Sequence, residues 1–287
     1  MDIRTDIKKD ETLRKSFTDL AKSTFGIDLE SWYRNGFWEN DYIPYCVIED
    51  GVVAANVSVN VCNIRWRGRI RHLAQIGTVM TAPAFRDKGY GKALMEKAVS
   101  DCLRSYEGIY LYTEDKTVSY YEQFGFYRTY EYGCHKKVNI TTSADAEKIP
   151  MDSKDEWDRM VDIIRRRSQY GDRIMVGNTG LFMFHLSGAL SDCVYYVPSS
   201  EAYAVAKVSG DELTLYAIFA DGKVGLGDVI SSFGSGIKRV NLAFSPENST
   251  GFDRIRIEDK DNILMTQGSI FDEYKNERSM FPEISHA

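Results

Sequence analysis

The sequence predicts a mixed α/β (α+β) fold organised as two domains, and three observations lead to this prediction. The chain of 287 residues exceeds the usual size of one hydrophobic core and suits two domains of about 140 residues each. Its first half contains antiparallel strand patterns, then an amphipathic helix and a buried strand, which together indicate a mixed sheet. Its second half repeats that order of predicted elements without repeating the residues.

Composition and charge exclude several classes of protein. Hydrophobic residues make up 43% and charged residues 27%, as in ordinary globular proteins. The five cysteines contain no CxxC pair, and no two of the four histidines have metal-ligand spacing, so we expect neither a disulfide framework nor a metal site. We expect a cytoplasmic protein, because no apolar run reaches about 20 residues and the N-terminus lacks a signal-peptide pattern. The net charge of −6 disfavours nucleic-acid binding and is compatible with a cationic substrate.

The first residues predict a short strand, and a helix and an aromatic segment follow it. Leu13, Phe17, Leu20 and Ala21 recur at helical spacing, and Gly26 is placed to end that helix. Residues 28–45 are then rich in Trp, Tyr and Phe. These aromatic side chains either pack the core or line an acceptor pocket, in which Trp32 would contact the substrate.

Three strands follow, at residues 45–49, 52–66 and 70–81, with Asp-Gly and Arg-Gly turns between them. This pattern predicts an antiparallel meander. One face of the middle strand is polar, since Asn56 and Ser58 alternate with valines. The polar face either contacts solvent or borders an acceptor cleft, and in the second case Asn56 is a candidate substrate-binding residue.

The remaining elements define two domains. A helix over residues 88–103, a buried strand at 108–112, a short helix at 117–123 and a strand at 126–138 complete the first half. A polar stretch carrying Pro150 follows, so we predict domains at 1–138 and 139–287. The second half begins with a helix around residues 157–164, and its further elements are predicted as strands 192–197, 202–208 and 212–220, a helix at 224–233, and strands 239–244 and 263–266.

The segment from Arg86 to Lys92 carries the chemistry. Gly89 and Gly91 allow close approach of a ligand to the main chain at the start of a helix, where free N–H groups and the helix dipole favour an anion such as a pyrophosphate. A dinucleotide fingerprint is excluded because Leu94 replaces its third glycine, and a Walker loop because Ala93 follows the lysine. A purely structural glycine turn remains open.

Two motifs resemble those of the GNAT superfamily of N-acetyltransferases. The sequence Arg-Asp-Lys-Gly-Tyr-Gly at 86–91 resembles the Arg/Gln-x-x-Gly-x-Gly/Ala signature of that family, and it lies between a strand and a helix. The sequence Tyr-Glu-Gln-Phe-Gly-Phe at 121–126 is similar to the Tyr-Glu-x-x-Gly-Phe segment. The resemblance covers residues 1 to about 138. It implies the GNAT fold, a mixed central sheet with a splayed parallel strand pair, and acetyl-CoA (coenzyme A) as the acyl donor.

The resemblance also implies roles for individual residues. Main-chain groups of Thr78, Val79 and Met80 would bind the pantetheine arm, and an amine would attack the thioester directly. Tyr121 would be the general acid. The general base could be His72, Glu114 or a water held by Gln75 or by a main-chain carbonyl, and the sequence does not decide among them. Glu114 stands where the family often has Asn. The pyrophosphate would be held by Arg86, Asp87, Lys88, Gly89, Tyr90, Gly91 and Lys92.

The second half resembles a degenerate GNAT-like domain of the tandem-domain enzymes. Its segment at 221–227 lacks the initial arginine, so we do not expect this domain to bind a cofactor. We expect the domain to form one wall of the acceptor cleft instead. The predicted function is N-acetylation of a small-molecule amine. Two alternatives stay open, a peptide or protein amine as acceptor and a noncatalytic acyl-CoA binding or sensing module.

Overall fold

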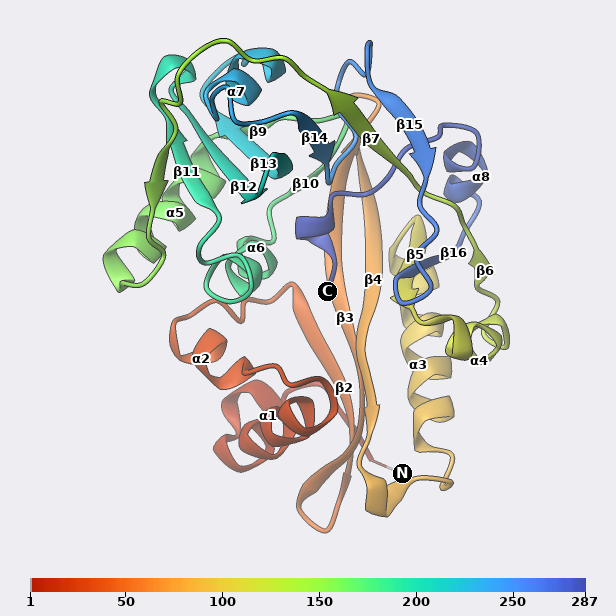
Figure 1. Ribbon diagram of the computed structural model, residues 1–287. Coiled ribbons are helices and arrows are strands. Elements are labelled where there is room, and N and C mark those ends of the chain that lie inside the picture. Colours follow the sequence, from red (N-terminus) through yellow and green to blue (C-terminus); the bar gives the residue numbers. More distant parts are fainter. Residues whose placement is uncertain (1) are drawn as a thin grey trace.

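The computed structural model describes residues 2–287 as two eight-stranded sheets with helices on their faces (Figure 1). Short 3₁₀ helices occupy Ile7–Lys9, Pro83–Phe85, Asp115–Thr117, Pro198–Ser200 and Glu283–Ser285. The elements up to residue 137 are β1 (Ile3–Arg4), α1 (Glu11–Phe25), α2 (Leu29–Arg34), β2 (Tyr42–Glu49), β3 (Val52–Trp66), β4 (Arg69–Thr81), α3 (Tyr90–Ser105), β5 (Gly108–Thr113), α4 (Val118–Glu122), β6 (Tyr127–Arg128) and β7 (Tyr132–Lys137).

The later elements repeat this alternation of strands and helices less regularly. They are β8 (Glu147–Ile149), α5 (Lys154–Arg166), β9 (Ser168–Gln169), β10 (Arg173–Val176), α6 (Thr179–Leu186), β11 (Val194–Val197), β12 (Ala202–Ser209), β13 (Glu212–Ala220), α7 (Leu226–Ser231), β14 (Arg239–Leu242), β15 (Asp253–Arg256), β16 (Ile263–Gln267) and α8 (Ile270–Tyr274). Helices α2, α6 and α8 and strands β8, β9, β10 and β15 were not predicted.

Helices α1 and α3 confirm the periodicity of the sequence. Asp10 caps α1 by accepting a hydrogen bond from the main-chain N–H of Leu13, and Gly26 ends the helix at φ 73°. Helix α3 buries Leu94 and Met95 against the first sheet. The two helices lie on opposite faces of this sheet, so both faces are covered (Figure 1).

The first sheet has the strand order β1-β2-β3-β4-β5-β16-β6, with β10 paired to the far end of β3. Its neighbouring strands are antiparallel except for β4 and β5, which are parallel over Leu73–Ile76 and Gly108–Leu111. Helix α3 connects these two strands, as the sequence predicted. The first sheet is therefore mixed, with one parallel pair near its centre.

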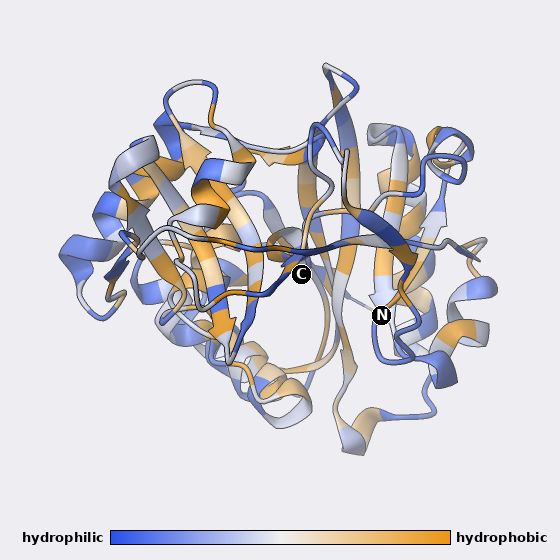
Figure 2. Ribbon diagram, turned by 45° about the horizontal axis from the view of Figure 1, so that its top comes forward, coloured by the Kyte–Doolittle hydropathy of each residue, from blue (hydrophilic) through white to orange (hydrophobic). Residues whose placement is uncertain are grey.

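The polar face of β3 is buried. Asn56 and Ser58 are 0% exposed and Asn60 is 2% exposed, so the interpretation that this strip contacts solvent is wrong. The strip lies beneath α1, α2 and α6, whereas Val57 and Val59 on the other face pack against α3. Figure 2 shows the hydrophobic colour along much of the strands in both sheets.

The two halves exchange strands. The predicted single strand at 126–138 is two strands, of which β6 joins the first sheet and β7 pairs with β14 and β15 in the second. Conversely, β16 lies between β5 and β6, and β10 pairs with β3. The predicted domain boundary at 138/139 therefore does not separate the two sheets, because each sheet contains strands from before and after residue 138.

The second sheet repeats the parallel pair of the first. Its order is β15-β7-β14-β13-β12-β11-β8, with β9 also paired to β13. Strands β13 and β14 are parallel over Glu212–Leu215 and Arg239–Leu242, and the short helix α7 connects them. This arrangement corresponds to β4, α3 and β5 in the first sheet.

Helix α6 joins the second half to the aromatic segment of the first. The indole N–H of Trp32 donates to the main-chain oxygen of Gly180 at 2.7 Å. The side-chain amide of Asn178 donates to the main-chain oxygen of Val61 at 2.9 Å. A Cβ at Gly180 would overlap the main chain of Phe37, so only glycine allows this approach. Across residues 2–287, none of the helices combines the length and apolarity that a membrane span requires.

Candidate active site

The parallel strands β4 and β5 separate at one end. Their pairing stops at Ile76 and Leu111, although β4 continues to Thr81 and β5 to Thr113. On its other side β4 has a bulge, because Ser58 pairs with Gly77 but Asn56 pairs with Met80. Thr78 and Val79 thus have no partner residue in either register, and their main-chain groups border the opening.

A buried hydrogen-bond network fixes the bulge. The Asn56 side-chain amide donates to the main-chain oxygen of Thr78 and to the Ser58 hydroxyl, both at 2.8 Å. The Tyr42 hydroxyl lies 2.7 Å from Thr78 Oγ1 and accepts from the Ser58 hydroxyl at 2.8 Å. These bonds hold Thr78 at φ 42°, which is unfavourable for a threonine. Asn56 accordingly lies beneath the bulge and positions it.

An exposed cradle of main-chain N–H groups lies at the start of α3. Gly89 occupies the N-cap at φ 78°, preceded by Asp87 at φ 62°, and a Cβ at Gly89 would meet no atom within 4 Å. Within residues 2–287 no acceptor bonds the N–H groups of residues 87–92. Arg86 and Lys88 are exposed beside them and form no ion pair with the described carboxylates. The cradle is therefore free to receive an anion.

The adjacent tyrosines 120 and 121 have different surroundings. The Tyr120 hydroxyl lies 3.3 Å from the point where a Cβ of Gly91 would stand, so Tyr120 borders the cradle. Tyr121 is largely buried beside Phe126. Burial raises the pKa of the Tyr121 phenol to about 12, partly offset by a hydrogen bond with Thr113 at the end of β5. Tyr121 thus keeps its proton at neutral pH and lies at the β5 edge of the opening.

A small apolar pocket lies on the other side of the sheet. It encloses about 50 Å³, and no lining side chain carries an acidic or basic group. Trp32 and Thr78 both line it, so the aromatic segment reaches the β4 bulge. The sequence did not indicate the contribution of α6, because its residues are apolar all round. The lining residues are Ile27, Leu29, Trp32, Tyr42, Asn60, Thr78, Leu181, Phe184 and Ala287.

The segment 279–287 enters the opening next to this pocket. A Cβ at Gly77 would stand 3.3 Å from the main-chain oxygen of Ala287, so glycine permits the approach of the two backbones. The imidazole of His286 stacks on the ring of Tyr112 with centroids 3.7 Å apart. Burial lowers the pKa of His286 to about 3, which leaves the imidazole neutral. No sequence motif predicted this contact.

Buried polar atoms without partners lie across β3, β4 and β5. Gln75 is 0% exposed, and neither its amide nitrogen nor its oxygen has a partner among the described residues. Its neighbours in register are Asn60, whose amide nitrogen is also unpartnered, and Tyr110, whose hydroxyl lacks a partner. Buried polar groups are normally hydrogen-bonded, so this cluster suits an ordered water or a polar substrate group.

The two titratable candidates for the base lie away from these groups. His72 is exposed near the start of β4, where its ring Nδ1 lies 2.7 Å from Asn63 Oδ1. Five residues separate it from Gly77, a distance of roughly 16 Å along a strand. Glu114 is exposed after β5 and forms an ion pair with Lys116. Neither the imidazole nor the carboxylate reaches the pocket.

The corresponding loop of the second half does not form a cradle. The Asp228 carboxylate occupies the place where a Cβ of Gly225 would stand, at the start of α7. A negative charge there opposes the binding of an anion. Over residues 2–287, the structure contains no group of three His, Cys, Asp or Glu side chains arranged to hold a metal ion.

Glu131 connects the 279–287 segment to β5. Its Oε1 accepts hydrogen bonds from the main-chain N–H of Phe281 at 2.8 Å, from the Tyr274 hydroxyl at 3.1 Å and from the Tyr112 hydroxyl at 3.3 Å. Burial raises the pKa of this carboxyl to about 7, although these donors act in the opposite direction.

Comparisons with known proteins agree with this geometry. The acetyltransferase (GNAT) family model matches residues 13–126. Among solved structures, a conserved protein from Enterococcus faecalis V583, a probable N-acyltransferase, aligns with a TM-score of 0.62 at 13% identity, covering 93% of this chain and 72% of that chain. No curated protein matches the chain.

Two further solved structures share the arrangement. A GCN5-related N-acetyltransferase from Kribbella flavida has a TM-score of 0.57 at 17% identity, over 92% of this chain and 70% of that chain. Eis1 from Mycobacterium abscessus has a TM-score of 0.57 at 12% identity, over 92% and 73%. Such identities show the fold alone, and they confirm the predicted GNAT fold.

We predict that Glu131 makes stability fall as pH rises from about 4.5 to about 7. Its folded pKa is raised, so its contribution to stability is complete below the unfolded pKa and is lost as pH passes the folded pKa. The loss should be about 3 kcal/mol. Urea unfolding at pH 5, 6, 7 and 8 should show a difference between wild type and Glu131→Gln that changes with pH. A constant difference for Glu131→Gln would refute the assignment.

Proposed function

We propose that this protein transfers the acetyl group of acetyl-CoA to the amine of a small molecule, because the acetyltransferase (GNAT) family model matches residues 13–126. One observation carries the proposal. The opening between β4 and β5 has a free anion cradle at the start of α3 and an apolar pocket at Thr78 on the other face of the sheet. A donor and an acceptor can therefore meet at the opening from opposite sides.

The cradle and the free edge of β4 fit coenzyme A. Main-chain N–H groups of residues 87–92, together with Arg86 and Lys88, match a pyrophosphate in charge and hydrogen bonding. The main-chain N–H of Thr78 and the main-chain groups of Val79, two residues without a register partner, match the amides of a pantetheine arm. Acetyl-CoA supplies an activated thioester carbonyl, which the N–H of Val79 or Met80 would polarise.

The pocket favours an amine that carries an apolar group. Trp32, Leu181 and Phe184 would contact that group, because most of the side chains that line the pocket are apolar. The nitrogen would attack the thioester carbon, the amide bond would form, and the carbon–sulfur bond would break. The nitrogen loses one proton and the sulfur gains one, so the reaction needs both a base and an acid.

Tyr121 is the proposed acid. Its hydroxyl remains protonated, because burial raises its pKa to about 12, and it lies at the β5 edge of the opening beside Thr113. It would donate to the departing sulfur. Tyr120 borders the cradle instead and has no role in proton transfer.

The proposed base is a water held by Gln75. Both polar atoms of this amide are buried without partners, and Asn60 beside it offers a free N–H. A water there would accept the proton of the amine and pass it to solvent. His72 and Glu114 take no part in this mechanism because of their distant, exposed positions.

The proposed function predicts a substrate preference. In a panel of amines assayed by thiol release, propylamine and isopropylamine should exceed spermidine, kanamycin and peptide N-termini by about 30-fold in kcat/KM, because burial of a three-carbon alkyl group contributes about 2 kcal/mol. The Trp32→Ala variant should lose this preference. Equal turnover of the polyamine would contradict the acceptor assignment, and binding of CoA without any turnover would favour a noncatalytic module.

Cofactor binding should depend on the empty space at Gly89. A glutamate side chain at this position would fill the cradle and repel the pyrophosphate, so Gly89→Glu should reduce CoA affinity at least about 100-fold in calorimetry. The matched control is Gly210→Glu, because Gly210 also has positive φ with no atom near its Cβ position but lies in the β12–β13 turn. Tight CoA binding by Gly89→Glu would place the pyrophosphate elsewhere.

The two tyrosines should behave differently. Tyr121→Phe should lower kcat by about 10²–10⁴-fold and leave CoA affinity unchanged, because only proton donation is removed. Tyr120→Phe should retain kcat within a few-fold. Steady-state kinetics with the best amine of the panel measure both effects, and a wild-type kcat for Tyr121→Phe would exclude it as the acid.

A further inference from the structure

A second pocket lies where the two sheets meet, remote from the opening. It encloses about 220 Å³ at the end of β3 that pairs with β10. Eight residues of β3 separate Trp66 at this end from Ser58 beside the bulge, or roughly 26 Å along the strand. The lining residues are Arg67, Cys134, Asp172, Arg173, Ser245, Pro246, Arg254, Glu277, Arg278 and Ser279.

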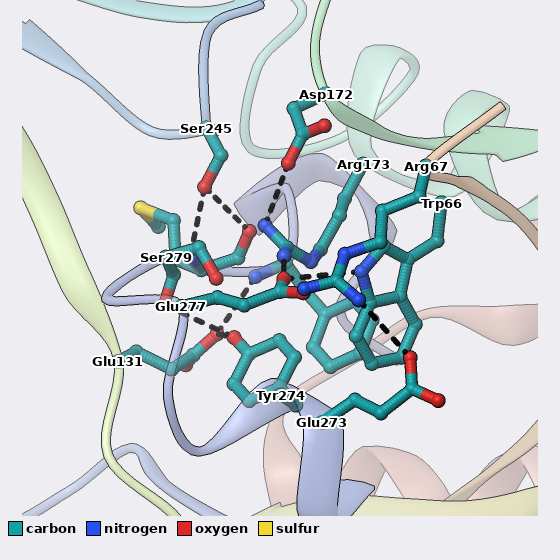
Figure 3. A network of polar contacts seen from close by, with 12 residues as sticks. Trp66, Arg67, Glu131, Asp172, Arg173, Ser245, Glu273, Tyr274, Glu277 and Ser279 are labelled. Carbon is teal, nitrogen blue, oxygen red and sulfur yellow. Dashed lines mark hydrogen bonds and ion pairs between the residues drawn. The ribbon is translucent and has the colours of Figure 1, made fainter. Parts of the chain in front are cut away.

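Two of its arginines are already paired with acids. Arg173 is 1% exposed, and its guanidinium lies between the rings of Trp66 and Tyr274, at 5.1 and 5.2 Å from their centroids. It forms ion pairs with Asp172, at 2.9 Å, and with Glu277, as Figure 3 shows.

Arg67 is the second arginine of this pocket that is paired with acids. This arginine pairs with Glu273 at 3.2 Å and also with Glu277. The two carboxylates that line the pocket, Asp172 and Glu277, are thereby neutralised by Arg173 and Arg67. Both acids are held in a fixed network and offer no free charge to a ligand.

Arg254 and Arg278 have no acidic partner in the described part of the chain. Their guanidinium groups hydrogen-bond to Ser249 Oγ and to the main-chain oxygens of Glu277 and Arg254, and the guanidinium group of Arg278 also lies 5.0 Å from the centroid of the Tyr132 ring. Both side chains are exposed at the rim. Four arginines and two carboxylates give the pocket a net charge of +2, in a protein whose net charge is −6.

The floor of the pocket adds donors without acceptors. The Ser279 hydroxyl and the Nε–H of Arg173 are buried, and neither has a hydrogen-bond partner within residues 2–287. The neighbouring Ser245 is satisfied, because it donates to the main-chain oxygen of Met280 at 3.1 Å and accepts from its N–H at 2.8 Å. Buried donors without acceptors are costly in a native protein unless a ligand or water meets them.

We propose that this pocket binds a small phosphate-bearing anion. Two unpaired guanidinium groups at the rim match the two negative charges of a phosphate, and the free donors on the floor match its oxygens. The volume of about 220 Å³ exceeds that of the inorganic ion and admits a phosphomonoester of a small metabolite. The site is separate from the cradle at α3 and does not depend on the proposed acetyl transfer.

Calorimetric titration with inorganic phosphate, glycerol phosphate and glucose 6-phosphate, at constant ionic strength, tests the proposal. The full chain with Gly89→Glu is used, so that the α3 cradle does not contribute. We expect saturable binding, at least about 10-fold weaker after Arg254→Gln or Arg278→Gln, because each substitution removes a charge-assisted contact. Tighter binding of an ester than of inorganic phosphate would identify the ester as the ligand class, and the reverse order would identify the free ion.

The matched control is Arg256→Gln. Arg256 is on β15 like Arg254 and is also exposed, but it pairs with Glu258 and does not line the pocket. It should bind the anions like the parent, and thermal melts in chloride buffer should be the same for all three arginine variants. Absence of saturable binding by every probe, or equal affinity in Arg254→Gln, Arg278→Gln and Arg256→Gln, would overturn the proposal.

Discussion

The separation of β4 from β5 is the constraint on which the site depends. Two parallel strands normally bond along their whole shared length, but here the pairing stops at Ile76 and Leu111 while both strands continue. The bulge places Thr78 and Val79, which have no register partner, at the gap, and buried hydrogen bonds among Asn56, Ser58, Tyr42 and Thr78 hold it. The anion cradle, Tyr121 and the apolar pocket all take their positions from this gap.

The exchange of strands ties the two halves into one unit. Because β16 lies between β5 and β6, the outer part of the first sheet is complete only when the second half is present. Strand β10, also from the second half, pairs with the end of β3, and α6 covers the buried polar strip. The buried ion pairs of Arg173 lie at this junction, where unpaired charges would be costly. The second half thus shapes the pocket as well as covering it.

Different parts of the site had different signals in the sequence. Glycines and arginine next to a helix start predict an anion loop from local chemistry, and the structure places residues 86–92 accordingly. The short range of such signals also explains why the sequence left the base undecided. His72 and Glu114 were candidates because they stand near the loop in the sequence, but strand geometry carries His72 to the far end of β4. Residues 279–287 and α6 reach the opening from more than 100 residues away, and no local pattern records such an approach.

Periodicity and residue chemistry by themselves determined the helices α1 and α3, the antiparallel meander, the parallel pair and the glycine loop before α3, because each depends on residues that are near one another in the sequence. Only the tertiary structure decided which sheet β7 and β16 join, since alternation of side chains does not specify a strand's partner. It likewise decided that the polar face of β3 is buried and that arginines from four distant segments share one pocket. These features depend on which surfaces pack together across the whole chain, and that is set by the total burial of apolar area and the pairing of buried charge.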